Sequence, residues 1–161
     1  MMKYYQRPEV IAAGIWVFAV AFIGGLLTEI GPWYYSLKQP GWKPPDWAFG
    51  IIWTVIFILS AIAWVKAYNV SNTSGDVTLL AILFIANGLL NALWSLLYFK
   101  LHRPDWSLIE AFILWFSVLL IILMMLKNCK TGALLMMPYL IWVSCAIALN
   151  YETIRLNGPF K

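Results

Sequence analysis

The sequence predicts an all-α integral membrane protein, a single bundle of five transmembrane helices over residues 1–161 with the first loop as a lid. Two observations lead to this prediction. Of the 161 residues, 63% are hydrophobic and only 11% are charged, whereas an ordinary soluble domain carries about 25% charged residues. The apolar residues are also gathered into five long continuous runs. So few polar side chains do not cover the surface of a water-soluble globule.

Each apolar run is long enough to cross a bilayer. The runs fall at about residues 10–31, 46–68, 77–99, 106–127 and 133–154. About 20 residues, each rising about 1.5 Å along a helix, cover the roughly 30 Å hydrocarbon core. Backbone hydrogen bonds inside a bilayer must be satisfied within the segment, so each run is predicted to be helical. The runs do not alternate between apolar and polar residues, which argues against a membrane β-barrel.

The breaks between runs contain helix-ending and turn-forming residues. The first loop, residues 33–45, concentrates tryptophan, tyrosine and proline between the first two runs. Proline interrupts helices, and tryptophan favours the membrane–water interface. We therefore expect a constrained, non-helical lid at the membrane surface. The other breaks are a polar segment at residues 69–75, a segment containing Pro104 at residues 102–105, and residues 127–132.

Polar side chains follow one face of the third predicted helix. Asn87, Asn91, Ser95 and Tyr98 recur at spacings of four, four and three residues, which places them on one side of a helix. An asparagine amide in hydrocarbon is costly without partners, so this face is expected to point into the bundle. For Asn87 we favour a role in holding helices together. For Asn91, helix contact and ligand contact stay equally open.

Two tryptophans lie deep inside their predicted helices. Trp53 shares a face with Phe49 in the second helix, and Trp142 shares a face with Ala146 in the fifth. Such stripes are most often packing surfaces, but a deep indole needs a partner for its N–H. Together with Asn91 the two indoles are suited to lining a cavity for a flat aromatic molecule.

Conventional catalytic and metal-binding sets are missing from the sequence. Glu29, Glu110 and Glu152 each lie near the end of a predicted span, where capping or interfacial solvation is their expected role. His102 is the only histidine, so no metal site is predicted. The basic residues occur singly at the ends of apolar runs rather than as a patch, which excludes nucleic-acid binding.

The motifs of the first loop and of three helices resemble those of the tryptophan-rich sensory protein, or translocator protein, family. The similarity covers nearly the whole chain. Its residues are Trp33-Tyr34, Leu37, Pro40, Trp42, Pro44-Pro45, Phe49, Trp53-Thr54, Asn91, Trp94-Ser95, Pro138-Tyr139-Leu140, Trp142, Ala146 and Leu149-Asn150. The resemblance implies a multi-pass protein of the bacterial cell membrane, or of the outer mitochondrial membrane if the source is eukaryotic.

The resemblance also implies a ligand and a site. The implied ligands are porphyrins, namely protoporphyrin IX and haem, and related flat hydrophobic molecules, with no required cofactor. The implied role is tetrapyrrole sensor, scavenger or carrier. The candidate ligand-binding residues are Tyr34, Pro45, Phe49, Trp53, Asn91, Ser95, Trp142 and Ala146.

Two alternative functions stay open within this resemblance. One is an enzyme that degrades porphyrin in a light- and oxygen-dependent reaction, with Trp53 and Trp142 as the photochemical residues. The other is a sterol or lipid translocator, because Leu149, Tyr151 and Arg155 match the form of the family's sterol element. One position departs from the family: many members have lysine immediately before Pro40, where this chain has Gln39.

The resemblance further implies a homodimer in the lipid bilayer. Two surfaces of small residues are candidates for the contact between subunits. Ala21 and Gly25 provide one on the first helix, and Gly88 and Ala92 provide the other on the third. The sequence does not choose between them.

Overall fold

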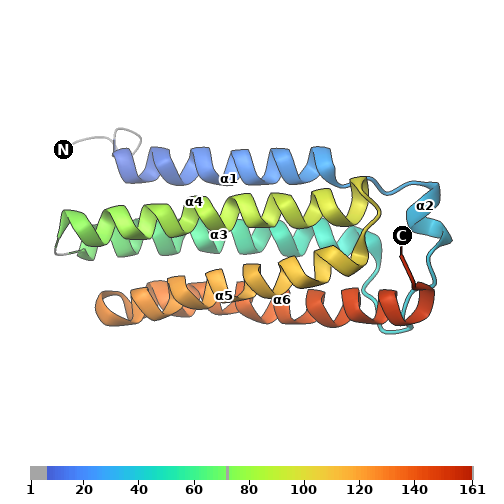
Figure 1. The fold of residues 1–161 in the computed structure, drawn as a ribbon. Helices are drawn as coiled ribbons and strands as arrows, with labels where there is room; N and C mark the ends of the chain where they lie inside the picture. The colour runs from blue at the N-terminus through green and yellow to red at the C-terminus, as the bar shows by residue number, and fades with distance from the viewer. Residues whose placement is uncertain (1–6, 72, 161) are drawn as a thin grey trace.

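The computed structural model, which describes residues 7–71 and 73–160, is a bundle of long helices (Figure 1). Within that part of the chain, five helical segments are long and apolar enough to cross a membrane. They are α1 (Pro8–Leu27), α3 (Asp46–Val70), α4 (Ser74–Ser95) continued by the π-helical turn η2 (Leu96–Lys100), α5 (Pro104–Asn128) and α6 (Lys130–Asn157). The predicted fold class is confirmed.

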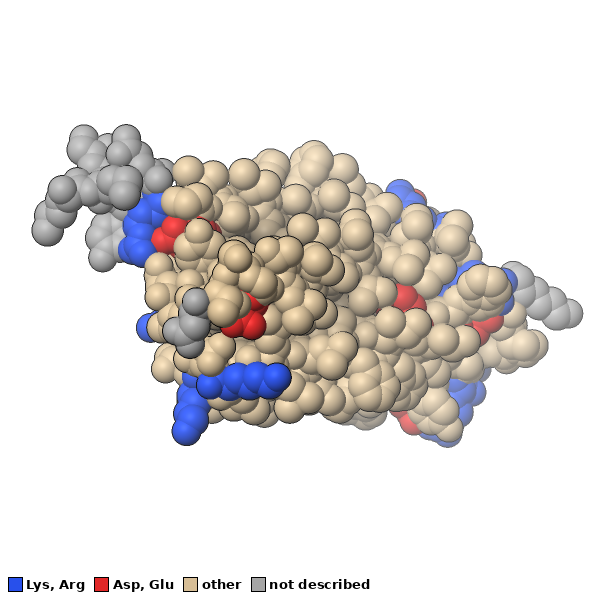
Figure 2. Space-filling model, turned by 60° about the vertical axis from the view of Figure 1, so that its left-hand side comes forward, with Lys and Arg blue, Asp and Glu red and all other residues tan. Residues whose placement is uncertain are grey.

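The long helices lie side by side, and the first loop crosses one end of the bundle. Figure 1 shows the short helix α2 (Pro32–Ser36) at the end where the chain finishes, opposite the start of α1. α5 packs along α6, α4 along α5 and α3 along α6, while α1 packs against α3 and α4. Charged side chains gather toward the two ends of the face in Figure 2, and the band between them is free of charge. This distribution fits a multi-pass membrane protein.

The first loop differs from its prediction because it contains a helical turn. α1 ends at Leu27 rather than near residue 31. Thr28 leaves the helix in an extended conformation, and its hydroxyl donates to the Gly24 carbonyl at 2.8 Å. Pro32 then begins α2 at its first position. Proline at this position already has the φ angle of a helix and needs no N–H partner, so a segment rich in proline still forms one turn.

The second break is shorter than predicted because a threonine caps the next helix. α4 begins at Ser74 rather than near residue 77. The Asp76 backbone N–H donates to Thr73 Oγ1 at 3.1 Å, and such a cap satisfies one of the N–H groups that a helix start leaves open. At its other end, α4 continues without interruption into η2.

The last break is reduced to a single residue, Cys129, between α5 and α6. The sequence around Gly132 was predicted to be a turn, but Gly132 is inside α6. A Cβ atom on Gly132 would lie 3.3 Å from the Ala63 carbonyl oxygen of α3. The glycine therefore permits close contact between α6 and α3 rather than a change of chain direction.

Gly88, which was a candidate for contact between subunits, is used inside the subunit. A Cβ atom there would lie 2.8 Å from Val20 Cγ2 and 3.0 Å from Trp16 Nε1, both on α1. Gly88 is buried by this contact, whereas Ala21 and Gly25 are exposed on α1. The homodimer stays a prediction. Of its two candidate surfaces, the one on α4 is covered by α1 at Gly88, and the residues of the one on α1, Ala21 and Gly25, line a cavity of this subunit.

Candidate functional site

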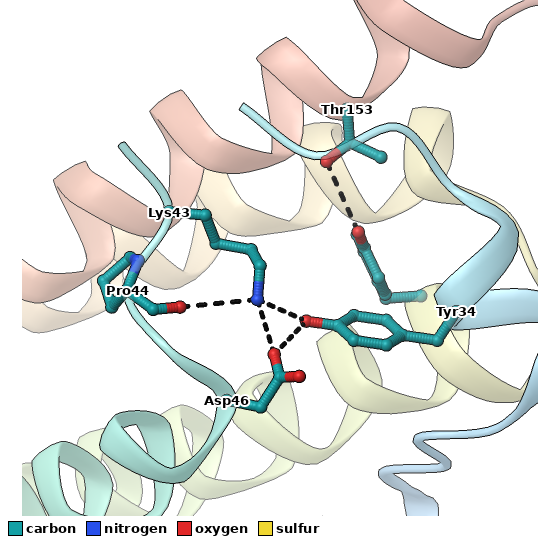
Figure 3. Close-up of polar contacts among 6 residues, drawn as sticks. Tyr34, Lys43, Pro44, Asp46 and Thr153 are labelled. Atoms are coloured by element: carbon teal, nitrogen blue, oxygen red, sulfur yellow. Dashed lines mark hydrogen bonds and ion pairs between the residues drawn. The ribbon is translucent and has the colours of Figure 1, made fainter. Parts of the chain in front are cut away.

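The first loop is held to the start of α3 by a group of three polar side chains (Figure 3). Tyr34 Oη donates to Asp46 Oδ1 at 2.8 Å, and the Lys43 ammonium donates to the same oxygen. Burial raises the pKa of the Tyr34 phenol, and the hydrogen bond to Asp46 adds to the effect. Tyr34 therefore stays protonated as a donor. We call residues 31–45 the lid.

A second connection ties the lid to the end of α6. The Lys38 backbone N–H donates to Asn157 Oδ1 at 2.8 Å, and Asn157 Nδ2 donates to the Lys38 carbonyl at 2.9 Å. One amide side chain thus pairs with both backbone groups of one lid residue, as a neighbouring β-strand would. The connection joins parts of the chain that are far apart in sequence.

A third connection joins the lid to η2 and the loop after it. The Trp33 ring stacks on His102 with centroids 4.1 Å apart, and Tyr34 lies against Phe99 at 5.8 Å. Glu29, just before the lid, pairs with Lys100 at 2.7 Å. The hydrogen bond and the charge of Lys100 lower the pKa of the Glu29 carboxyl. The lid is thus attached to α3, α6 and η2.

A cavity of about 690 Å³ lies beneath the lid. Its volume is inside the roughly 300–1,000 Å³ range of small-molecule sites. The walls come from the lid, α1, α3, α4, α5 and α6. The residues that matter here are Tyr34, Gln39, Lys43, Asp46, Phe49, Trp53, Asn91, Trp94, Ser95, Trp142, Ala146 and Leu149.

Aromatic rings form two walls of this cavity. On α3, Trp53 stacks on Phe57 with centroids 5.4 Å apart and meets Tyr139 edge-on at 5.7 Å. Phe49 and Trp142, from α3 and α6, meet edge-on at 5.5 Å. Each ring is fixed by its neighbour, so the walls are already shaped before a ligand enters. Flat rigid walls suit a flat apolar molecule.

Several N–H donors around the cavity are buried and unused. Within residues 7–71 and 73–160, the indole nitrogens of Trp94 and Trp142 and the Gln39 side-chain nitrogen have no hydrogen-bond partner. Asn91 differs, because its side-chain nitrogen donates to Tyr139 Oη at 3.2 Å. A buried donor without an acceptor costs about 1–3 kcal/mol. A ligand with suitably placed acceptor atoms would remove this cost.

The structure brings most of the predicted site residues together. Of the eight candidates for ligand binding, seven line the cavity: Tyr34, Phe49, Trp53, Asn91, Ser95, Trp142 and Ala146. Pro45 stands outside the set of described cavity-lining residues; it is exposed and takes the N-cap position of α3. Its effect on the site is indirect, because it sets where α3 begins and so where Asp46 lies.

Two asparagines from one sequence stripe have separate roles. Asn87 is fully buried and donates to Ser117 Oγ on α5 at 2.9 Å. This contact confirms the expectation that Asn87 holds helices together. Asn91, one turn later, lines the cavity. Its contact with a ligand stays a prediction.

The residues of the sterol-like pattern do not share a surface. Leu149 is buried and lines the cavity, whereas Tyr151 is exposed on the outside of α6. Arg155 pairs with Glu152 at 2.8 Å. An external sterol would meet Tyr151 and Arg155 without Leu149.

Several cavity residues with polar donors were not predicted for the site, and those that matter here are Gln39, Lys43 and Trp94. Trp94 was part of the recognised motif but was not chosen for the site. The turn that brings Gln39 and Lys43 inward is closed by the Lys43 backbone N–H donating to the Pro40 carbonyl at 3.0 Å. Proline and glycine at the two positions after Gln39 are a turn signal, and this signal could have placed both side chains on one side of the lid.

Glu110 is a correction to the predicted roles of the acidic residues. It was expected to be solvated or to cap a helix, but it is 4% exposed in α5. Neither of its carboxyl oxygens meets a hydrogen-bond donor from the described residues. Glu29 and Glu152 do lie at the helix ends as expected, paired with Lys100 and Arg155.

The chain is similar to known proteins over most of its length. A model of the TspO/MBR family matches residues 12–156. The tryptophan-rich protein TspO of Chlorobaculum tepidum is 36% identical over 86% of this chain and 89% of its own length. Protein CrtK of Rhodobacter capsulatus is 32% identical over 90% and 95%. The human translocator protein is 27% identical over 80% and 77%. These matches confirm the resemblance of the motifs, and the chain belongs to the TspO/MBR family.

Proposed function

We propose that this membrane protein binds a porphyrin, such as protoporphyrin IX or haem, in the cavity beneath the lid and acts as a tetrapyrrole sensor, scavenger or carrier. The observation that carries the proposal is the composition of the cavity. It combines two ordered aromatic walls with buried indole N–H groups that have no acceptor within the described chain. A flat macrocycle with polar atoms at its edge satisfies both features.

The cavity also supports the proposal by its depth. Trp53 and Trp142 lie within helices that span the bilayer, and both contribute to its walls. An apolar pigment dissolved in the membrane would therefore exchange lipid contacts for ring contacts of fixed geometry. Relatives carry the names tryptophan-rich sensory protein and translocator protein, which fits a ligand-binding role in the membrane.

The test is a titration of the purified protein with protoporphyrin IX and with haem in the dark, followed by quenching of tryptophan fluorescence. We expect saturable binding of one porphyrin per cavity. The double variant Trp53→Phe/Trp142→Phe should bind about tenfold more weakly or worse, because it loses ring area and two indole N–H groups. Binding that is equal in the wild type and the double variant would refute the proposal.

A second candidate, the light- and oxygen-dependent degradation of porphyrin, is favoured by the same two indoles. Bound porphyrin would absorb light, O₂ would be the oxidant, and Trp53 or Trp142 would donate an electron or trap the reactive oxygen species. Illuminating the protein–porphyrin complex in air should give products that free porphyrin does not give. If the complex gives only the products of free porphyrin, and the double variant and the wild type bleach bound pigment alike, the protein binds porphyrin without degrading it.

A further inference from the structure

The polar groups of the lid that line the cavity are chiefly donors, and one of them is cationic. Lys43 lines the cavity with only 16% of its side chain exposed. Gln39 lines it too, and its side-chain nitrogen is buried without a partner in the described residues. The tight turn between them directs both side chains to the same space. The lid therefore offers N–H groups to whatever the cavity holds.

Lys43 is close to the aromatic wall. Its Nζ atom lies 5.6 Å from the centroid of Phe49, and the Phe49 ring lies 5.5 Å from the centroid of Trp142. A planar ligand against Phe49 and Trp142 would thus have one edge near the ammonium group. The ring of Trp142, whose indole N–H is buried without a partner among the described residues, also lines this cavity.

The contacts of Lys43 leave room for an anion. Lys43 Nζ is bound to Asp46 Oδ1, but its other contacts are long: 3.2 Å to Tyr34 Oη and 3.3 Å to the Pro44 carbonyl (Figure 3). An ammonium group has three N–H donors. A ligand carboxylate replaces the two weak contacts while the pair with Asp46 stays in place. Asp46 then competes with the ligand for the charge of Lys43.

We propose that the lid recognises an ionised carboxylate on the edge of the ligand, with Lys43 and Gln39 donating to its oxygens while the flat apolar body lies against Phe49 and Trp142. This inference rests on the proposed porphyrin function and adds the chemical group by which the ligand is oriented. Lys38, the neighbouring lid lysine, does not take this role, because its side chain lies outside the described cavity lining and is exposed.

The test compares two ligands with the same macrocycle: protoporphyrin IX, which has two free carboxylates, and its dimethyl ester, in which both carboxylates are uncharged methyl esters. Both are dispersed in the same detergent and titrated in the dark at neutral pH. The wild type should bind the free acid about tenfold to a hundredfold more tightly than the ester, the range of one charge-assisted contact. Equal affinity would overturn this inference and leave porphyrin binding intact. If neither compound binds, the proposed function fails as well.

Variants then assign the preference to residues. Lys43→Met and Gln39→Leu should each lower the ratio of acid to ester affinity, and Lys43→Arg should keep it. Lys38→Met is the matched control, a lysine of the same lid that lies outside the site, and it should keep the wild-type ratio. If the ratio of acid to ester affinity is unchanged in both Lys43→Met and Gln39→Leu, these two residues do not bind the carboxylate.

Asp46→Asn separates recognition of charge from support of the lid. It removes the competitor for Lys43, so it should raise the ratio of acid to ester affinity, in the direction opposite to Lys43→Met. A lid that is merely loosened would lower affinity for both ligands in both variants. Thermal unfolding of each variant in detergent establishes that it is folded. A fall in the ratio for Asp46→Asn would overturn the role assigned to Lys43.

Discussion

Tryptophan occurs in both halves of the bundle, but its indole N–H group is used differently in each. In the half away from the lid, Trp16 Nε1 donates to the Phe84 carbonyl at 2.7 Å, and Trp64 Nε1 donates to the Glu9 carbonyl at 3.0 Å. At the end away from the lid, the tryptophan N–H groups join helices by hydrogen bonds. Around the cavity, the N–H groups of Trp94 and Trp142 have no acceptor among the described residues.

The difference shows which tryptophans hold the fold and which are available to a ligand. Trp16 and Trp64 pack in the main apolar core and join α1 to α4 and α3 through backbone carbonyls. Trp142 also packs against this core, but its ring pairs with Phe49 and lines the cavity, and its N–H has no acceptor among the described residues. An unpaired N–H inside a membrane protein is costly, so it is expected where a second molecule completes it. Burial alone does not separate these two classes, whereas hydrogen bonding does.

The largest effect should come from filling the cavity. Ala146 lines it from α6, whereas Ala148 is exposed on the same helix. We expect Ala146→Phe to lower porphyrin affinity about a hundredfold, equal to about 3 kcal/mol, because the new ring occupies the space of the ligand. Ala148→Phe is the matched control and should bind as the wild type does. Fluorescence titration measures both, and similar affinities for the two variants would mean that the ligand lies elsewhere.

Exchanging tryptophan for phenylalanine in each half tests the comparison directly. Trp64→Phe should lower the free energy of unfolding by about 1 kcal/mol, because the Glu9 carbonyl loses its donor. Its affinity for porphyrin should not change. Trp142→Phe should weaken binding and leave the unfolding free energy nearly unchanged.

The two variants are measured by denaturant unfolding in detergent and by porphyrin titration. Opposite outcomes in the two assays are the result that we expect. If Trp142→Phe destabilises the protein as much as Trp64→Phe does, its indole supports the fold and is not reserved for a ligand.

The long elements of the fold could be predicted because each depends on a local property. Uninterrupted apolar length predicts a spanning helix whatever its neighbours are, and Asp46, directly after two prolines, was correctly placed at the start of α3. Some errors were local, such as the missed turn of α2 and the early start of α4, whereas two came from contacts between distant segments. Gly132 looked like a turn residue, but the approach of α3 requires it inside α6. Gly88 looked free for another subunit, but α1 covers it.

The residues that line the site could be predicted from the positions of the family motifs. The hydrogen-bond partners of these residues could not. Seven of the eight candidate residues line the cavity. Spacing along a helix gives the face on which Asn91 lies, but not whether an acceptor stands opposite Trp94 or Trp142. The turn signal indicates the side of the lid on which Lys43 lies, but not that its ammonium group contacts Asp46 and Tyr34, which come from different elements. Pairing of this kind requires coordinates.

Glu110 is a buried polar group without a partner among the described residues, like the Trp142 indole, but it does not line the cavity. Its substitution therefore tests whether such a group matters for ligand binding only when it lines the cavity. An ionised carboxylate there would be buried with no donor from the described chain, so its removal should do no harm. Taking an ion out of water into a protein interior costs several kcal/mol, and an apolar residue of similar volume avoids this cost. We expect Glu110→Leu to raise the unfolding free energy by about 1 kcal/mol with no change in porphyrin affinity.

Thermal unfolding in detergent measures the effect of Glu110→Leu, with Glu152→Gln as the control. Glu152 is paired with Arg155 at the end of α6, so its substitution should give a small loss of stability or none. A clear fall in stability or in porphyrin affinity for Glu110→Leu would show that the Glu110 carboxyl has a hydrogen-bond or charge partner in the functional protein.

The smallest effect should be a pH dependence of the lid, through the exposed pair of Glu29 and Lys100. The hydrogen bond and charge of Lys100 lower the pKa of Glu29 from its model-compound value of 4.5. A carboxyl whose pKa is lower in the folded state stabilises that state above the unfolded pKa, and the contribution disappears as pH falls through the folded pKa. Glu29→Gln should therefore increase hydrogen exchange in residues 28–37 slightly at pH 7, relative to the wild type. This difference should persist at pH 5 and be smaller at pH 3, because protonation of the wild-type carboxyl removes the pairing as pH falls toward its lowered pKa. A difference that is the same at all three pH values would show that the side chain acts through its shape and not through its charge.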